Sequence, residues 1–242
     1  MNTSYSPLPG LRPVGSDQVL DQKIGDVTGD GVPDTVILTG RVTADSPYVT
    51  GITLVVHSWG DRRTFRVQPE NNAGYQPTLL LGDFTGDKVD DILIRIDSGG
   101  SGATTFDYLY TFAGGQMNLI FDSEKYNQMW NYTVDYLDNY LLRVSSPGAD
   151  KTYTVDIASR GEEYLNQIYN PNGTLKKPVQ GFADPLSGLY PIDLDRDGTY
   201  ELMALQGVSG LYHADRFGYM TNLLKWNKGA WELVQQWFAF LG

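Results

Sequence analysis

Three short acidic segments contain the residues of this chain that are best suited to binding a metal ion. They begin at Asp26, Asp83 and Asp193, and each has oxygen-bearing side chains at its first, third, fifth and ninth positions. A hard cation such as Ca²⁺ takes about six to eight oxygen ligands, and alternate acidic residues on a tightly turned loop can direct their oxygens to one point. Asp-Gly pairs also form ordinary turns, but three loops with one shared spacing favour three calcium sites.

Each predicted site combines carboxylate or hydroxyl side chains with the backbone carbonyl of position seven. The predicted ligands are Asp26, Thr28, Asp30, Val32 and Asp34 in loop one, Asp83, Thr85, Asp87, Val89 and Asp91 in loop two, and Asp193, Asp195, Asp197, Thr199 and Glu201 in loop three. Glycines at positions four and six of loop one permit positive φ, so the backbone can curl around a cation.

The composition of the loops also predicts which metal they bind. No histidine or cysteine accompanies the oxygen ligands, which argues against zinc and copper, and Mg²⁺ requires a tighter octahedron. Loop three has four charged ligands and is predicted to bind Ca²⁺ most tightly. The twelfth positions, Ile37, Ile94 and Ala204, are not the glutamate that an EF-hand requires.

The spacing of the loops indicates an internal repeat. The interval from Asp83 to Asp193 is about twice that from Asp26 to Asp83, and the segment Asn131–Asn139 aligns without gaps on loop two. This fourth copy has neutral residues at its ends and Val134 at its turn, so we predict that it binds no metal.

Strand signals surround each loop and predict an all-β fold. Each repeat contains about four strands, and there are about four repeats. The expected total of about sixteen strands fits a β-propeller with four-stranded blades. The predicted repeats of this single domain, residues 1–242, are 20–76, 77–126, 127–187 and 188–242. Five blades, or a β-sandwich with calcium loops, are the alternatives.

The loops resemble the Asp-x-[Thr/Asn/Asp]-x-Asp-Gly-x-x-[Asp/Glu] calcium loops of FG-GAP and VCBS repeats, which build integrin-α-like propellers. The resemblance covers the loops and their flanking strands, whereas the Phe-Gly and Gly-Ala-Pro signatures of integrin blades are missing; Phe112-Ala-Gly-Gly is at best a remnant. It implies calcium loops facing one side of the disc, an extracellular or cell-surface setting, and a role in binding or adhesion.

The composition restricts the partners and the location. The net charge of −11 argues against nucleic acid and anionic lipid, and the chain has no cysteine. No apolar run has the length of a membrane span, so we expect no membrane insertion and an export signal that has already been removed. An extracellular or cell-surface location is predicted because weak calcium sites fill only where calcium is abundant, with a cytoplasmic location as the alternative. The sequence does not predict an oligomeric state.

Two functions compete with that of a binding or adhesion module for a protein ligand. Exposed aromatic rings would suit a carbohydrate-binding protein, and the candidates are Trp59, Tyr75, Trp130, Tyr212 and Tyr219. A glycan-active enzyme is less well supported: Ser209, His213 and Asp215 are close in sequence, but no catalytic motif surrounds them. We therefore predict a non-enzymatic protein.

Overall fold

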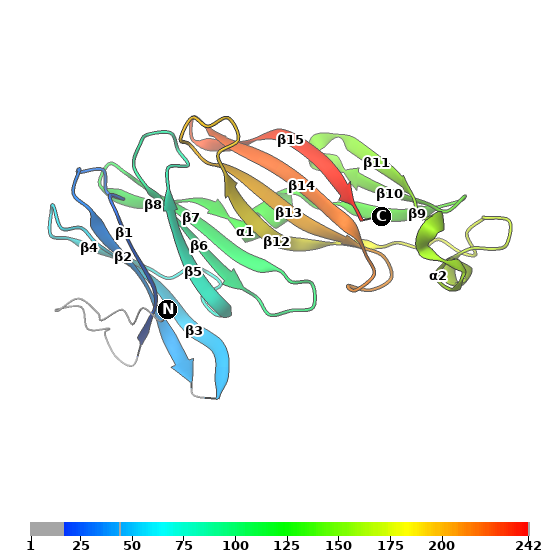
Figure 1. Ribbon diagram of the computed structural model, residues 1–242, viewed down its shortest axis with the longest axis horizontal. Helices are drawn as coiled ribbons and strands as arrows, with labels where there is room; N and C mark the ends of the chain where they lie inside the picture. The colour runs from blue at the N-terminus through cyan, green and yellow to red at the C-terminus, as the bar shows by residue number, and fades with distance from the viewer. Residues whose placement is uncertain (1–16, 44, 242) are drawn as a thin grey trace.

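The fold is all-β, as predicted. The computed structural model describes residues 17–43 and 45–241, and within these ranges fifteen strands form four antiparallel sheets. Strands that follow one another in sequence pair with one another in every sheet, so each sheet is a meander (Figure 1). No helix among these residues is long and apolar enough to cross a membrane.

The first sheet contains β1 (Gln18–Gly25), β2 (Asp34–Thr43), β3 (Ser46–His57) and β4 (Thr64–Val67). Loop one connects β1 to β2. The last pair of residues before the loop is Gly25 with Asp34.

The second sheet contains β5 (Tyr75–Gly82), β6 (Asp91–Asp97), β7 (Thr105–Ala113) and β8 (Gln116–Asp122). Loop two connects β5 to β6 in the same register, since Gly82 pairs with Asp91.

The third segment of the chain departs from this plan. Its sheet has only three strands, and short helices flank it. The elements are α1 (Ser123–Met129), β9 (Thr133–Leu137), β10 (Leu141–Ser146), the 3₁₀ turn η1 (Pro147–Ala149), β11 (Lys151–Asp156), the 3₁₀ turn η2 (Ala158–Arg160) and α2 (Glu162–Ile168).

The last sheet restores the four-stranded meander with β12 (Phe182–Ile192), β13 (Glu201–Ser209), β14 (Arg216–Asn227) and β15 (Ala230–Phe240). Loop three connects β12 to β13, and Ile192 pairs with Glu201 before it.

The prediction of a closed propeller is wrong, because the sheets do not form a ring. The four sheets lie in an open row, with β1–β4 at one end, then β5–β8, then β12–β15, and β9–β11 at the other end (Figure 1). A ring would require the first sheet to pack on the last of the row, whereas these two lie at opposite ends of the molecule.

The degenerate fourth copy explains part of this difference. Residues 133–137 form strand β9, and a tight turn with positive φ at Asn139 and Tyr140 leads directly into β10, in place of a nine-residue loop. The outer edge of β9 pairs with the segment that enters β12, through hydrogen bonds from the Tyr136 amide to the Val179 carbonyl (3.2 Å) and from the Gly181 amide to the Val134 carbonyl (2.9 Å). The third sheet is therefore bound to the fourth along this edge.

Two hydrophobic cores hold the row together, and β6 contributes to both. Ile92, Ile94 and Ile96 are buried against the first sheet, whereas Leu93 is buried in the core shared with the last two sheets. Successive side chains of a strand point to opposite faces, so the second sheet is covered on both faces.

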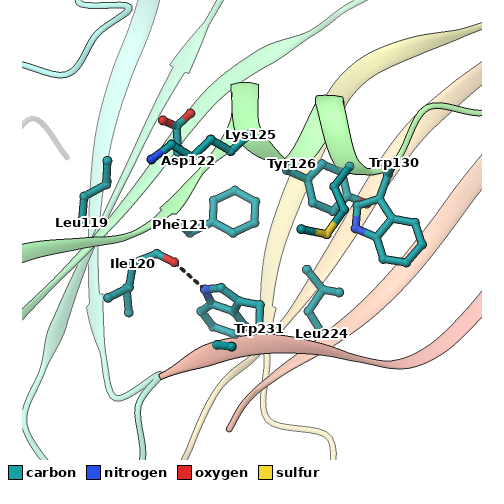
Figure 2. A pocket seen from close by; sticks show the side chains of 11 residues that line it. Leu119, Ile120, Phe121, Asp122, Lys125, Tyr126, Trp130, Leu224 and Trp231 are labelled. Carbon is teal, nitrogen blue, oxygen red and sulfur yellow. Dashed lines mark hydrogen bonds between the residues drawn. The ribbon is translucent and has the colours of Figure 1, made fainter. Parts of the chain in front are cut away.

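An apolar pocket of about 250 Å³ lies between the end of β8, α1 and the β14–β15 hairpin (Figure 2). Phe121, Tyr126 and Trp231 form much of its wall, and the Trp231 indole donates a hydrogen bond of 2.8 Å to the Ile120 carbonyl.

Candidate metal centre

The three acidic loops have positive φ at the same two positions. Positions four and six adopt positive φ in every loop, whether or not a glycine is present. The residues are Gly29 (75°), Gly31 (80°), Gly86 (79°), Lys88 (68°), Arg196 (61°) and Gly198 (88°). Lys88 and Arg196 thus accept a conformation that disfavours residues with a Cβ, which indicates that the loop imposes it.

The carboxylate at position one closes each loop from inside. Asp26 accepts hydrogen bonds of 2.8 Å from the amides of Gly29 and Gly31. Asp83 accepts the equivalent pair in loop two, at 2.6 and 2.8 Å. In loop three Asp193 accepts from positions five and six, at 3.1 and 3.2 Å. The first predicted ligand of each site therefore also stabilises the turn.

The carboxylate at position nine lies beneath the loop and is buried. One oxygen of Asp34, Oδ2, accepts from the amides of Val27 (3.0 Å) and Thr28 (2.9 Å). The same oxygen of Asp91 accepts from the amides of Phe84 (2.8 Å) and Thr85 (3.1 Å).

The other oxygen of each position-nine aspartate has no partner. Oδ1 of Asp34 and Oδ1 of Asp91 are buried without a hydrogen bond, and so are the hydroxyl oxygens of Thr28 and Thr85. Buried polar atoms are almost always satisfied, so these oxygens, at equivalent positions of two loops, are the candidate metal ligands of loops one and two. Burial raises the pKa of Asp91 to about 6, as expected for a carboxylate that lacks a neighbouring cation.

The position-five aspartates are more exposed. Asp30 and Asp87 accept from the position-seven amides at 2.8 and 2.9 Å, and Asp197 does the same from Thr199 at 2.8 Å. In loops one and two these carboxylates do not converge with the other acidic groups as closely as in loop three.

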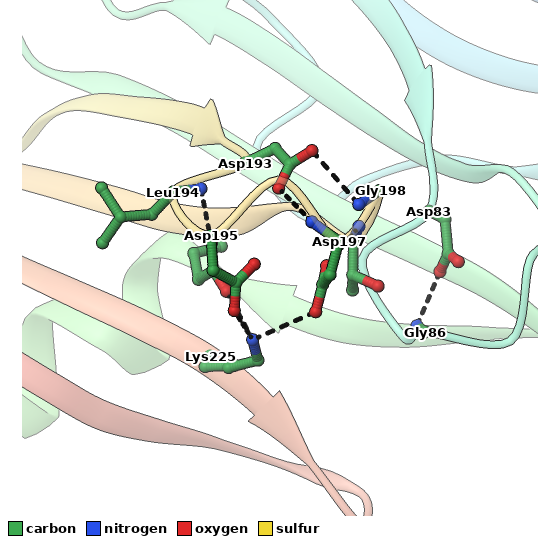
Figure 3. A network of polar contacts seen from close by, with 10 residues as sticks. Asp83, Gly86, Asp193, Leu194, Asp195, Asp197, Gly198 and Lys225 are labelled. Carbon is green, nitrogen blue, oxygen red and sulfur yellow. Dashed lines mark hydrogen bonds and ion pairs between the residues drawn. The ribbon is translucent and has the colours of Figure 1, made fainter.

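Loop three differs because its acidic side chains meet. Among residues 17–43 and 45–241, the one group of three metal-ligating side chains whose oxygens lie within 4.8 Å of one another is Asp193, Asp195 and Asp197. The ammonium of Lys225, from β14, lies beside them, 3.0 Å from Asp195 and 3.6 Å from Asp197, and 2.8 Å from Glu201 (Figure 3). Lys225 is not identifiable from the loop motif, because it lies 24 residues beyond the loop; the signal that identifies it is the register of β13 with β14.

The loops also nest against one another. The amide at position eight of loop two, Asp90, donates to the position-one carbonyl of loop one, Asp26 (3.1 Å). The amide of Tyr200 donates to the carbonyl of Asp83 in the same way (2.7 Å). Consecutive loops therefore have the same relative placement, and the three form a continuous acidic row.

Residues considered for catalysis do not assemble into a triad. The Ser209 hydroxyl donates to the backbone carbonyl of His213 (3.3 Å), and His213 Nδ1 lies 2.7 Å from Asp184 instead of Asp215. Asp215 is paired with Arg160.

The candidate aromatic residues divide by exposure. Trp59 and Tyr212 are 54% and 60% exposed, whereas Trp130 is buried in the core between α1 and the last sheets. Tyr75 and Tyr219 are half-buried.

Comparison with known proteins corrects the resemblance inferred from the loops. The family model that matches is the YybI C-terminal domain, over residues 130–239, and not an FG-GAP or VCBS repeat. No solved structure matches the chain. The loop spacing misled because nine residues with alternating oxygens are a local solution for a β–β connection, and they do not determine whether the sheets close into a ring.

A relative is similar over most of the chain. The uncharacterized protein YybI of Bacillus subtilis (strain 168) is 45% identical over 216 residues, which cover 89% of this chain and 82% of that protein. The chain therefore belongs to the YybI family.

Proposed function

We propose that this protein is a calcium-binding all-β module that acts outside the cell, where Ca²⁺ bound in loops one and two organises a surface for binding a partner. The observation that carries the proposal is the set of unpartnered buried oxygens of Thr28 and Asp34, repeated at Thr85 and Asp91. Hydroxyl and carboxylate oxygens are ligands that Ca²⁺ accepts, and a bound ion would supply the missing partner of each.

The charge of the loops supports a cation rather than a neutral guest. Loop one holds three aspartates and loop two holds four, counting Asp90. Burial and the neighbouring Asp26 and Asp83 raise the pKa of Asp90, which lies in loop two and contacts Asp26 of loop one. A divalent ion in each loop would offset this repulsion.

The expected affinity supports an extracellular setting. Sites of this kind in extracellular modules bind at about 0.1–1 mM. At about 0.1 mM affinity, ~1 mM free Ca²⁺ stabilises the folded state by about 1.4 kcal/mol per site. Such sites would not fill at cytosolic calcium concentrations.

An exposed aromatic ring beside loop one supports a binding role for this surface. Trp59 is 54% exposed, and its indole is fixed by a 3.0 Å hydrogen bond to the Thr35 hydroxyl. The next residue, Gly60, lies against Asp30 so closely that a Cβ there would be 1.9 Å from a carboxylate oxygen. A fixed ring next to a metal loop suits a protein or a glycan ligand, since both offer flat apolar surface.

The experiment that tests calcium binding is a melting scan in chelator and in ~1 mM Ca²⁺. Two occupied sites raise the free energy of unfolding by about 3 kcal/mol, which shifts the midpoint of a chain of this size by about 6–12 °C. Asp34→Asn and Asp91→Asn should each lose about half of the shift, whereas Asp150→Asn, an exposed acidic residue outside the loops, should keep it all. An unchanged midpoint for the wild-type protein would reject the proposal.

Trp59→Ala tests the binding surface separately. The variant should keep the calcium-dependent shift of the melting midpoint. It should no longer bind the glycans on an array that the wild-type protein binds. If the wild-type protein binds no glycan in calcium, a carbohydrate ligand is rejected and the protein-ligand version remains to be tested with Trp59→Ala in a cell-surface adhesion assay.

A further inference from the structure

We infer that Lys225 is the resident cation of loop three, so that this loop is complete without a metal ion and the protein binds Ca²⁺ in loops one and two only. The inference rests on the proposed function of those two loops and goes beyond it, since it assigns the third loop a different chemistry.

The ammonium lies where the side chains of positions three, five and nine meet. Its nitrogen is 3.0 Å from Asp195, 3.6 Å from Asp197 and 2.8 Å from Glu201 (Figure 3). All three oxygens lie within 3.6 Å of the ammonium nitrogen, so a metal ion bound by the same oxygens would occupy the same place. The ammonium and a Ca²⁺ ion therefore exclude each other.

The matching positions of the other loops carry hydroxyl groups. Leu202 pairs with Leu224, which places Lys225 opposite Glu201 at position nine. Ile92 pairs with Tyr110, so Thr111 is the equivalent residue for loop two. Thr35 pairs with His57, so Ser58 is the equivalent residue for loop one.

These equivalents leave the first two loops without an internal cation. Ser58 and Thr111 are buried, and neither side chain carries a charge. Glu201, the buried position-nine carboxylate of loop three, has no oxygen without a partner, in contrast to Asp34 and Asp91. The position-nine carboxylate is thus satisfied where a lysine faces it, and not where a hydroxyl does.

Position nine of loop three also fits a lysine partner. Glu201 replaces the aspartate of the other loops, and its longer side chain accepts from the Leu194 amide (3.1 Å) with one oxygen and meets Lys225 with the other. Glu201 therefore links the loop backbone to the Lys225 ammonium.

Calcium stoichiometry by equilibrium dialysis tests the inference, with circular dichroism to check folding. The wild-type protein should bind two ions per chain. Lys225→Thr, which copies loop two, should bind three, and the matched control Lys225→Arg should bind two. The reciprocal change Thr111→Lys should lower the number to one, because it places an ammonium opposite Asp91.

The outcomes separate this inference from the proposed function. Three ions in the wild-type protein, or two in a folded Lys225→Thr or a folded Thr111→Lys, would overturn the inference while calcium binding stands. No ions in the wild-type protein would overturn both. If Lys225→Thr does not fold, Asp195→Asn decides, since its side chain is exposed: two ions support the inference, and one ion overturns it.

Discussion

The buried carboxylate of Asp107 predicts a pH dependence of stability that can be measured without knowing any ligand. Asp107 lies on β7 of the second sheet, and its side chain is 0% exposed. It accepts from Arg95 Nε at 3.1 Å and from the Thr105 hydroxyl at 2.5 Å. Burial raises its pKa from 3.8 to about 6, because desolvation outweighs the nearby guanidinium.

The sign and size of the effect follow from linkage. The folded state holds the proton more tightly than the unfolded state, so the stabilisation from the protonated group is complete below about pH 4 and is lost as the pH rises to about 6. The two pKa values differ by about two pH units, and each unit corresponds to about 1.4 kcal/mol, so the loss is on the order of 3 kcal/mol. Asn at this position does not ionise.

The assay is urea denaturation in chelator at several pH values between 4 and 8. Asp91 titrates in the same range, so the informative quantity is the difference between the wild-type protein and Asp107→Asn. Relative to the wild-type protein, the variant should gain about 3 kcal/mol between pH 4 and pH 7. A pH-independent difference for Asp107→Asn would refute the reasoning.

Three further predictions concern the backbone and the contacts between sheets. Lys88→Gly should raise the free energy of unfolding by about 0.5–1 kcal/mol in calorimetry, because it relieves a positive φ of 68°; a loss of stability would contradict the imposed conformation. Gly82→Ala should cost about 1–3 kcal/mol, since its Cβ would lie 2.7 Å from the Tyr200 ring, and an unchanged urea midpoint would exclude that close packing. Arg95→Ala should lower the free energy of unfolding by about 3 kcal/mol or more, because it leaves the buried carboxylate of Asp107 unpaired and removes a 2.7 Å hydrogen bond to the Leu189 carbonyl. A loss below about 1 kcal/mol would show that other contacts hold the second and last sheets together.

The loops and their strands could be predicted from the sequence because their structure is local. The spacing of Asp26, Gly29, Gly31 and Asp34 specifies both the turn and the hydrogen bonds that close it, and the same holds for loop two. The β-branched runs that leave each loop form β2 and β6 as expected, since alternate apolar residues determine which face is buried.

The arrangement of the sheets could not be predicted in the same way. A repeat count indicates how many sheets exist, but the order in the row depends on long-range pairing, such as the bond from Gly181 to Val134. The copy at 131–139 aligned on loop two by residue type, yet Asn139 and Tyr140 adopt positive φ and make a tight hairpin instead. Lys225 could not be identified from the sequence for a related reason, since its place beside loop three depends on the register of β13 with β14.

The nesting of the loops gives the row a direction, with a definite first and last member. Loops two and three each donate one backbone hydrogen bond to the loop before them, from the amides of Asp90 and Tyr200. The equivalent residue of loop one is Pro33, which has no hydrogen to give, so this loop cannot follow another of its kind. At the other end Leu194 is 59% exposed, whereas its counterparts Val27 and Phe84 are covered by the next sheet. Loop one is therefore the first member of the acidic row, and loop three is the last.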